Sequence, residues 1–451
     1  MDNSAKTKLA SDRRSFLKTS SVAAGAVGSS LLLPKNSFAR SVHVGETNTI
    51  RVGLIGCGGR GTQGVQQAMN TESGPVQLTA MADVFDYRLN DSLKNLEVRM
   101  KEKFKEQVFV DDDHKFVGFD AYEKVLQSDV EMVILTTPPG FRPLHFEKAI
   151  EAGKHVFMEK PVAVDGPGIR RVLAANEKAK EKGLMVGVGL QRRHESAYRE
   201  CVARIQEGDI GDINLLRAYW NGQTPWVRGR QEGQTELEYQ MSNWYFFNWI
   251  CGDHIVEQHI HNLDVCNWIM DGFPVKAQGQ GGREVRKGKD HGQIFDHHFI
   301  EFTYEDGTKM FSQCRHQEVC WSQVHEYAHG SKGMCDLRRA EIKYSDGSDW
   351  RSTERKGGGH QLEHHDWFKD LRDGRIPNEG EYGAKSTMTA ILGRMATYCG
   401  KEITWEQGLN STLSHANVDE MKSFDDPAPV QPDENGNYPV PVPGKSWDDV
   451  L

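Results

Sequence analysis

Short apolar runs alternate with helical periodicity in the first part of the chain. Helical patterns at 119–127 and 165–182 separate runs that are too short and too uniformly apolar to be helices. Such runs are typical of buried parallel strands, and they cover residues 50–55, 76–84, 132–136, 155–158 and 184–190. The alternation predicts an α/β fold that begins with a doubly wound parallel sheet of the Rossmann type over residues 50–188.

The pattern changes after residue 190. Strand patterns follow at 215–220, 275–279, 297–304 and 309–313, and Asp306-Gly307 between the last two is typical of a hairpin turn. We therefore expect residues 189–404 to form an α+β domain with a large open antiparallel sheet. The Pro-rich segment 405–451 is expected to be an extended surface arm that could contact a second subunit.

A glycine-rich loop follows the first strand directly. Gly56, Gly58 and Gly61 match the G-x-G-x-x-G pattern, and residues 62–69 are helical in pattern. Gly56 permits the tight turn, Gly58 lets the backbone approach a pyrophosphate, and Gly61 allows close packing of helix on strand. Asp83 ends the second strand, where a carboxylate bonds the ribose hydroxyls and repels a 2′-phosphate. The sequence predicts NAD as the cofactor, with a glycine turn that binds no ligand as the alternative.

The first 39 residues differ from the rest of the chain. Residues 11–18 (SDRRSFLK) match the twin-arginine export signature, an apolar stretch follows at 22–33, and Ser37-Phe38-Ala39 offers a cleavage site. The apolar stretch is too short to span a bilayer stably. We expect a signal peptide at 1–39, a linker at 40–49, export to the periplasm and no stable membrane insertion after cleavage. An N-terminal helix of the folded domain is the alternative.

Charge and cysteine content exclude several classes of protein. The formal net charge of −9 argues against a nucleic-acid-binding surface. The eight cysteines include no C-x-x-C pair, which argues against a zinc ribbon or a redox dithiol. Twin-arginine substrates fold before export in a reducing compartment, so these cysteines need not form disulfides.

Two motifs lie at the carboxyl edge of the predicted parallel sheet. Thr136-Thr137-Pro138-Pro139 ends one strand, and Glu159-Lys160-Pro161 ends the next. An ammonium group at Lys160, near the nicotinamide, can hydrogen-bond a substrate hydroxyl and stabilise the alkoxide that precedes hydride loss.

The segment 220–249 is unusually rich in aromatic residues, Trp244 and Tyr245 among them. Flat sugar faces stack on such rings, but aromatic clusters are also common in protein cores. Both interpretations stay open.

A run of polar residues follows at 253–264. If this run is helical, His254, Glu257, His261 and Asp264 form one polar stripe, in which Glu257 orients His261 as a general base. A metal site and a structural histidine cluster are alternatives, although neither H-E-x-x-H nor H-x-x-E-H is present, and we expect no metal. Farther along the chain, the consecutive residues His364 and His365 are expected on a partly exposed helix face.

From about Thr49 to Thr404 the chain resembles the Gfo/Idh/MocA family of oxidoreductases. The motifs that carry the resemblance are Gly56–Gly61, Asp83, Thr137-Pro138, Glu159-Lys160-Pro161, Gln191-Arg192-Arg193 and Glu257…His261…Asp264. It implies a Rossmann domain with an open-sheet domain, dimers or tetramers formed through that sheet, and sugar or polyol substrates. Lys160 then matches the catalytic lysine and His261 the general base. The implied cofactor contacts are Gly56, Gly58, Gly59, Arg60, Gly61, Asp83, Thr137, Pro138, Arg142, Glu159, Lys160 and Gln191. The implied substrate contacts are Lys160, Arg192, Trp244, Tyr245 and His261.

The sequence departs from the family pattern at several positions. Glu257 replaces the usual Asp, and His259 replaces the usual Gly, which is expected to bring a second imidazole near the site. Pro139 replaces an Asn, and Arg142 replaces a frequent His. The Gly59-Arg60 pair resembles a cofactor-contacting pair of exported NAD-dependent glycosidases, but the Tyr-Pro pair that precedes their histidine is absent.

Together these features predict an exported oxidoreductase that transfers hydride between a sugar, polyol or glycoside and tightly bound NAD. One alternative is redox-neutral glycoside cleavage through oxidation, elimination, hydration and re-reduction. Another is a non-catalytic protein that holds NAD and binds carbohydrate.

Overall fold

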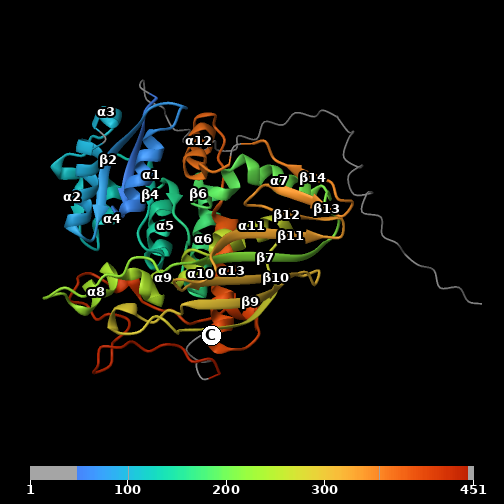
Figure 1. Cartoon of the computed structure of the whole chain (residues 1–451). Coiled ribbons are helices and arrows are strands. Elements are labelled where there is room, and N and C mark those ends of the chain that lie inside the picture. The colour runs from blue at the N-terminus through green and yellow to red at the C-terminus, as the bar shows by residue number, and fades with distance from the viewer. Residues whose placement is uncertain (1–47, 100, 355, 445–451) are drawn as a thin grey trace, which may run out of the picture. The chain divides into compact units, whose positions relative to one another are not determined.

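The computed structural model describes residues 48–99, 101–354 and 356–444 (Figure 1). The predicted signal peptide, nearly all of the linker and the last residues of the C-terminal arm lie outside the described residues. Within the described ranges, no helix combines the length and the apolar character needed to cross a bilayer.

The first sheet confirms the Rossmann prediction. Its strand order is β3-β2-β1-β4-β5-β6, and every neighbouring pair is parallel. The strands are β1 Ile50–Ile55, β2 Val76–Asp83, β3 Lys115–Val117, β4 Met132–Leu135, β5 His155–Met158 and β6 Val186–Val188. The order reverses between β1 and β4, and ligands of doubly wound sheets bind at this switch point.

The helices of this part run between its strands. They are α1 Gly59–Met69, α2 Asp86–Lys94, α3 Lys101–Phe104, α4 Ala121–Gln127, α5 Arg142–Glu151 and α6 Gly166–Glu181. A π-helical turn, η1 Asn95–Arg99, lies between α2 and α3. Asp165 caps α6 by accepting a hydrogen bond from the Gly168 amide at 2.8 Å.

The second sheet is open, as predicted, and has nine strands in the order β14-β13-β12-β11-β7-β10-β9-β8-β15 (Figure 1). They are β7 Ile213–Gly222, β8 Lys276–Gly282, β9 His297–Thr303, β10 Lys309–His316, β11 Gln323–Gly330, β12 Gly333–Asp336, β13 Glu341–Tyr344, β14 Asp349–Arg351 and β15 Ile403–Thr404. Every neighbouring pair in this sheet is antiparallel except β7 and β10, which are parallel. A parallel pair requires a long crossover connection between its two strands, and the residues between β7 and β10 provide it.

Eight helices belong to the later part of the described chain. They are α7 Ser196–Gln206, α8 Glu236–Ser242, α9 Asn248–Cys251, α10 His254–Glu257, α11 Ile260–Met270, α12 Gly359–Arg372, α13 Gly380–Cys399 and α14 Trp405–Leu409. Helices α11 and α13 pack against the second sheet. In contrast, α12 packs against α1, and its Trp367, Phe368 and Leu371 share a core cluster with β1. The later part of the chain therefore contributes a helix to the first sheet's core.

The described part of the C-terminal arm folds back onto the same chain. Phe424 stacks on Phe85 with ring centroids 5.1 Å apart and meets Phe119 edge-on at 5.3 Å. Asp419 accepts two hydrogen bonds from the Arg171 guanidinium of α6 at 2.7 and 2.8 Å. The arm is thus held to the Rossmann part by a ring stack and an ion pair.

Candidate active site

A cavity of about 620 Å³ lies over the glycine loop at the carboxyl edge of the parallel sheet. Residues from both parts of the chain line it. Among the predicted site residues, those that line it are Gly56, Gly58, Gly59, Arg60, Gly61, Asp83, Thr137, Pro138, Arg142, Glu159, Lys160, Trp244, Glu257 and His261. A volume of this size is typical of a small-molecule or cofactor site.

The glycine loop has the geometry that a dinucleotide requires. Gly56 has φ of +99°, and a Cβ on Gly61 would lie 2.0 Å from the Gly56 carbonyl oxygen, so both positions need glycine. A Cβ on Gly58 or Gly59 would meet no protein atom within 4 Å. The space above these two residues is therefore open toward the cavity. The first turn of α1 also carries no acidic side chain or side-chain cap, so its amides remain available to phosphate.

Asp83 lies at the end of β2, beside this loop. Its carboxylate accepts the Cys57 amide at 2.6 Å and the Phe85 amide at 2.9 Å. Burial raises the pKa of Asp83 above its usual value, although these hydrogen bonds oppose the shift. The open cradle over the glycine loop and this carboxylate fit the pyrophosphate and ribose of NAD.

Arg142 supports the turn on the other side of the cavity. Its guanidinium donates to the Leu135 carbonyl at 2.7 Å and to the Thr137 carbonyl. Burial lowers the pKa of Arg142 to about 10. Because these contacts are with the main chain at the end of β4, Arg142 fixes the Thr137-Pro138 turn while also lining the cavity.

Lys160 forms an ion pair with Glu257. The ammonium nitrogen lies 2.9 Å from the Glu257 carboxylate and also donates to the Glu257 carbonyl. Both side chains are largely buried, with 12% and 15% of their surface exposed. The Glu257 carboxylate is thus paired with this lysine, and no hydrogen bond joins it to His261, the residue that it was expected to orient, among the described residues.

His261 faces the same cavity and is stacked on Trp220, with ring centroids 6.0 Å apart. Its Nδ1 is buried without a hydrogen-bond partner among the described residues. Burial, reinforced by the positive charges of Lys160 and Arg192, holds the pKa of His261 well below its usual value. The imidazole is therefore neutral at neutral pH and has a ring nitrogen lone pair that can accept a hydrogen bond.

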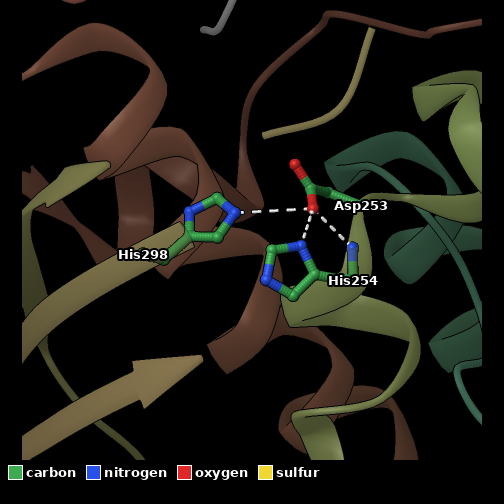
Figure 2. A group of neighbouring side chains, drawn as sticks. All are labelled: Asp253, His254 and His298. Carbon is green, nitrogen blue, oxygen red and sulfur yellow. Dashed lines mark hydrogen bonds and ion pairs between the residues drawn. The ribbon is translucent and has the colours of Figure 1, made fainter. Parts of the chain in front are cut away.

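The predicted polar stripe does not form, because the helix is interrupted. Helix α10 ends at Glu257 and α11 begins at Ile260. Glu257 and His261 reach the cavity, whereas His254 is fully buried beside Asp253 and His298 (Figure 2). Because the regular helix stops at Glu257 and resumes only at Ile260, sequence spacing across 253–264 does not define one face.

Asp253, His254 and His298 form a buried cluster in which Asp253 Oδ1 lies 2.7 Å from His254 Nδ1 and 3.4 Å from His298 Nε2. Each residue offers one atom that could ligate a metal ion, and these three atoms lie within 4.8 Å of one another. Yet the Asp253 Oδ1 to His254 Nδ1 distance is 2.7 Å, whereas two ligands of a tetrahedral zinc lie about 3.3 Å apart. The other Asp253 oxygen accepts the Phe295 amide at 2.9 Å and the Tyr398 hydroxyl at 2.5 Å. Asp253 thereby ties α10 to β9 and α13, which is the structural interpretation of this histidine cluster.

Two other residues of this segment also lie away from the cavity. His259 is fully buried, with its Nε2 2.8 Å from the Ser312 hydroxyl, so it does not supply the expected second imidazole. Asp264 pairs with Arg193 at 2.8 Å and accepts the Ser386 hydroxyl at 2.7 Å.

Three further predicted site residues are not among those that line the cavity. Arg192 is buried in an ion pair with Glu326. Gln191 begins the short 3₁₀ helix η4 Gln191–His194. Tyr245 is buried, and burial together with the Glu257 charge raises its pKa well above the usual value.

The aromatic segment divides between the two interpretations that the sequence left open. Trp220, Trp226 and Trp244 line the cavity. In contrast, Tyr239, Tyr245, Phe246, Phe247 and Trp249 are core residues. Three of the eight aromatic rings named for this segment are thus placed where a substrate could contact them.

Several cavity residues were missed by the sequence reasoning. Arg88 from α2, Arg228 from the aromatic segment and His360 from α12 all line the cavity. His360 stands at the start of α12, the helix that also carries His364, and the packing of α12 on α1 brings it to the site. The neighbouring His364 was expected on a partly exposed face and is instead fully buried between Phe157 and Trp367.

Comparisons with known proteins agree with this architecture. Residues 50–190 match the family model described as "Oxidoreductase family, NAD-binding Rossmann fold", and residues 198–336 match the "GFO/IDH/MocA C-terminal domain". The chain is 28% identical over 243 residues to the inositol 2-dehydrogenase of Gluconacetobacter diazotrophicus, an alignment that covers 54% of this chain and 61% of that protein. It is 28% identical over 182 residues to the scyllo-inositol 2-dehydrogenase (NAD(+)) of Bacillus subtilis, covering 40% and 44%. The chain thus spans about half the length of these curated relatives.

Solved structures show the same fold. The scyllo-inositol dehydrogenase of Lactobacillus casei with bound NAD(H) and scyllo-inositol superposes with a TM-score of 0.59 at 19% identity, covering 79% of this chain and 99% of that one. A levoglucosan dehydrogenase in complex with NADH and levoglucosan gives a TM-score of 0.61 at 16% identity, covering 80% and 100%. With the two matched models spanning most of the chain, the protein is a member of the Gfo/Idh/MocA oxidoreductase family with an NAD-binding Rossmann domain.

Proposed function

We propose that this protein is an NAD-dependent oxidoreductase that oxidises a ring hydroxyl of a sugar, polyol or glycoside. The observation that carries the proposal is the meeting of Lys160 and neutral His261 in the one cavity that also contains the glycine loop. The named activities of the inositol dehydrogenases to which the chain is similar support the polyol class.

The chain's own groups divide the chemistry between them. Lys160 donates a hydrogen bond to the hydroxyl oxygen and stabilises the negative charge that develops on it. His261 accepts the hydroxyl proton as the carbinol becomes a ketone. NAD, when bound over the glycine loop, supplies the acceptor for the hydride that leaves the carbinol carbon. Glu257 balances the charge of Lys160 and holds its ammonium group at the cavity wall.

The test is direct. Purified protein is incubated with NAD and a panel that contains scyllo-inositol, myo-inositol, free sugars and glycosides, and NADH absorbance is followed. We expect at least one polyol or sugar to reduce NAD, and Lys160→Met to slow the reaction at least about 100-fold. Lys124→Met, which changes a half-exposed lysine of α4 outside the cavity, is the matched control. NAD binding with no reduction by any panel member would favour the carbohydrate-binding alternative instead. Glycoside cleavage without net NADH would favour the redox-neutral one.

We further propose that the enzyme is exported by the twin-arginine pathway with its cofactor already bound. The support is the sequence pattern at residues 11–18 beside an NAD-binding domain. Replacing Arg13 and Arg14 by Lys in a fusion to a periplasmic reporter should abolish export. Unchanged export would refute this part of the proposal.

We also infer a homodimer or homotetramer formed through the second sheet. On β9 and β10 the side chains alternate between buried and partly exposed, and Phe299 is 41% exposed beside Phe311. Light scattering of the wild type and of Phe299→Lys tests the inference, because a dimer through this face should dissociate in the variant.

A further inference from the structure

His360 lies at the start of α12 and lines the cavity together with Lys160 and His261. Its side chain is 39% exposed. All three side chains line one cavity, which Arg60 and Glu159 also line. Neither the sequence motifs nor the reaction proposed above uses this imidazole.

Glu363, one helical turn further along α12, holds one side of the ring. The Nδ1 of His360 lies 3.4 Å from Glu363 Oε1. Glu363 itself is fully buried, and its Oε1 also lies 3.5 Å from the Arg60 guanidinium. With Nδ1 directed at Glu363, the other ring nitrogen has no partner among the described residues and is the one left for a ligand.

The charged groups around His360 keep it neutral. Burial lowers its pKa to about 4, and the positive charges of Arg60 and Lys160 outweigh the opposing effects of Glu159 and Glu195. Burial and the Glu159 charge raise the pKa of Glu363 well above its usual value. A neutral imidazole with one free nitrogen can donate or accept a single hydrogen bond, which suits a hydroxyl group.

A purely structural role does not require this placement. Arg60 of α1 lies 3.5 Å from Glu363, and Gln361 donates a hydrogen bond to the Gln67 carbonyl of α1 at 3.0 Å, so these contacts already attach α12 to α1. The apolar contacts of Trp367 and Phe368 add to that attachment. His360 could face solvent without loss of either.

We propose that His360 binds a second hydroxyl of the substrate, adjacent to the one that His261 and Lys160 act on. The site would then select substrates that carry a vicinal diol. This inference rests on the proposed function and names a residue that determines its substrate class.

The test uses the full-length protein and the polyol that gives the highest rate in the panel. His360→Ala and the conservative His360→Asn are compared with His365→Ala, which changes the adjacent histidine of the same helix outside the cavity. We expect His360→Ala to raise KM about 10-fold, the loss of roughly one hydrogen bond, while kcat changes less than about threefold. His360→Asn should recover part of the affinity, and NAD affinity should be unchanged in all three variants.

A monodeoxy analogue of the same polyol, lacking the hydroxyl next to the oxidised carbon, completes the test. The wild type should bind this analogue about as weakly as His360→Ala binds the parent polyol, and His360→Ala should make little further difference with the analogue. An unchanged KM in His360→Ala, or an equal loss in His365→Ala, would overturn the inference and leave the proposed function intact. A wild type that oxidises no polyol or sugar would overturn both.

Discussion

Two glycines of the same loop should respond in opposite ways to the same substitution. In Gly61→Ala the new methyl group would lie 2.0 Å from the Gly56 carbonyl oxygen and 2.5 Å from the Thr136 hydroxyl. Main-chain atoms cannot move away cheaply, so we expect the overpacking to cost about 1–3 kcal/mol of stability. In Gly58→Ala the methyl group meets no protein atom within 4 Å and φ is −68°, so the fold should tolerate it.

The cost of Gly58→Ala should instead appear in cofactor binding. The methyl group would occupy the space into which the pyrophosphate fits, and we expect NAD affinity to fall about 100-fold, or about 2.7 kcal/mol. At an NAD concentration about 100 times the wild-type Kd, bound NAD stabilises the wild type by about 2.7 kcal/mol. The same concentration should stabilise Gly58→Ala by only about 0.4 kcal/mol.

Thermal melts with and without NAD, together with calorimetric titration of NAD, separate the two effects. Gly61→Ala should melt several degrees lower without NAD. Gly58→Ala should melt near the wild type without NAD and gain almost nothing from its addition. The reasoning fails if Gly58→Ala keeps wild-type NAD affinity, or if Gly61→Ala melts as the wild type does.

Three further predictions concern the chemistry, the arm and the buried histidines. Lys160→Met should lower kcat by about 10²–10⁴-fold with NAD affinity retained, measured by steady-state kinetics and titration, and a small effect would remove Lys160 from the reaction. Phe424→Ala should speed NAD release, measured by stopped-flow fluorescence, because its ring supports the Phe85 and Phe119 wall of the cavity; the exposed Trp321→Ala is the control. Burial lowers the pKa of His145 to about 3 and of His254 to about 4, so between about pH 6.5 and 4 the unfolded chain binds more protons than the folded one. The free energy of unfolding should therefore decrease as the pH is lowered, by about 2 kcal/mol per histidine at about pH 5. A melting temperature that stays constant down to that pH would contradict this.

The sequence by itself determined the features that depend on neighbouring residues. The glycine spacing, the apolar run before it and Asp83 at the end of the next strand are local signals, and each predicts the same strand-loop-helix unit. Lys160 follows a strand in a parallel sheet, whose carboxyl edge is shared by all its strands, so its place at the cavity also followed from local pattern.

Only the tertiary structure decided which of the later polar residues meet at the cavity. The spacing fitted one continuous helix, but the chain breaks between α10 and α11. His254 lies in the core beside Asp253, and Glu257 contacts Lys160. His360 lines the cavity because α12, although it follows strands of the second sheet in the sequence, packs on α1 of the Rossmann part. A helical period defines which residues share a face, but the face that becomes buried depends on partners hundreds of positions away, and no local pattern encodes them.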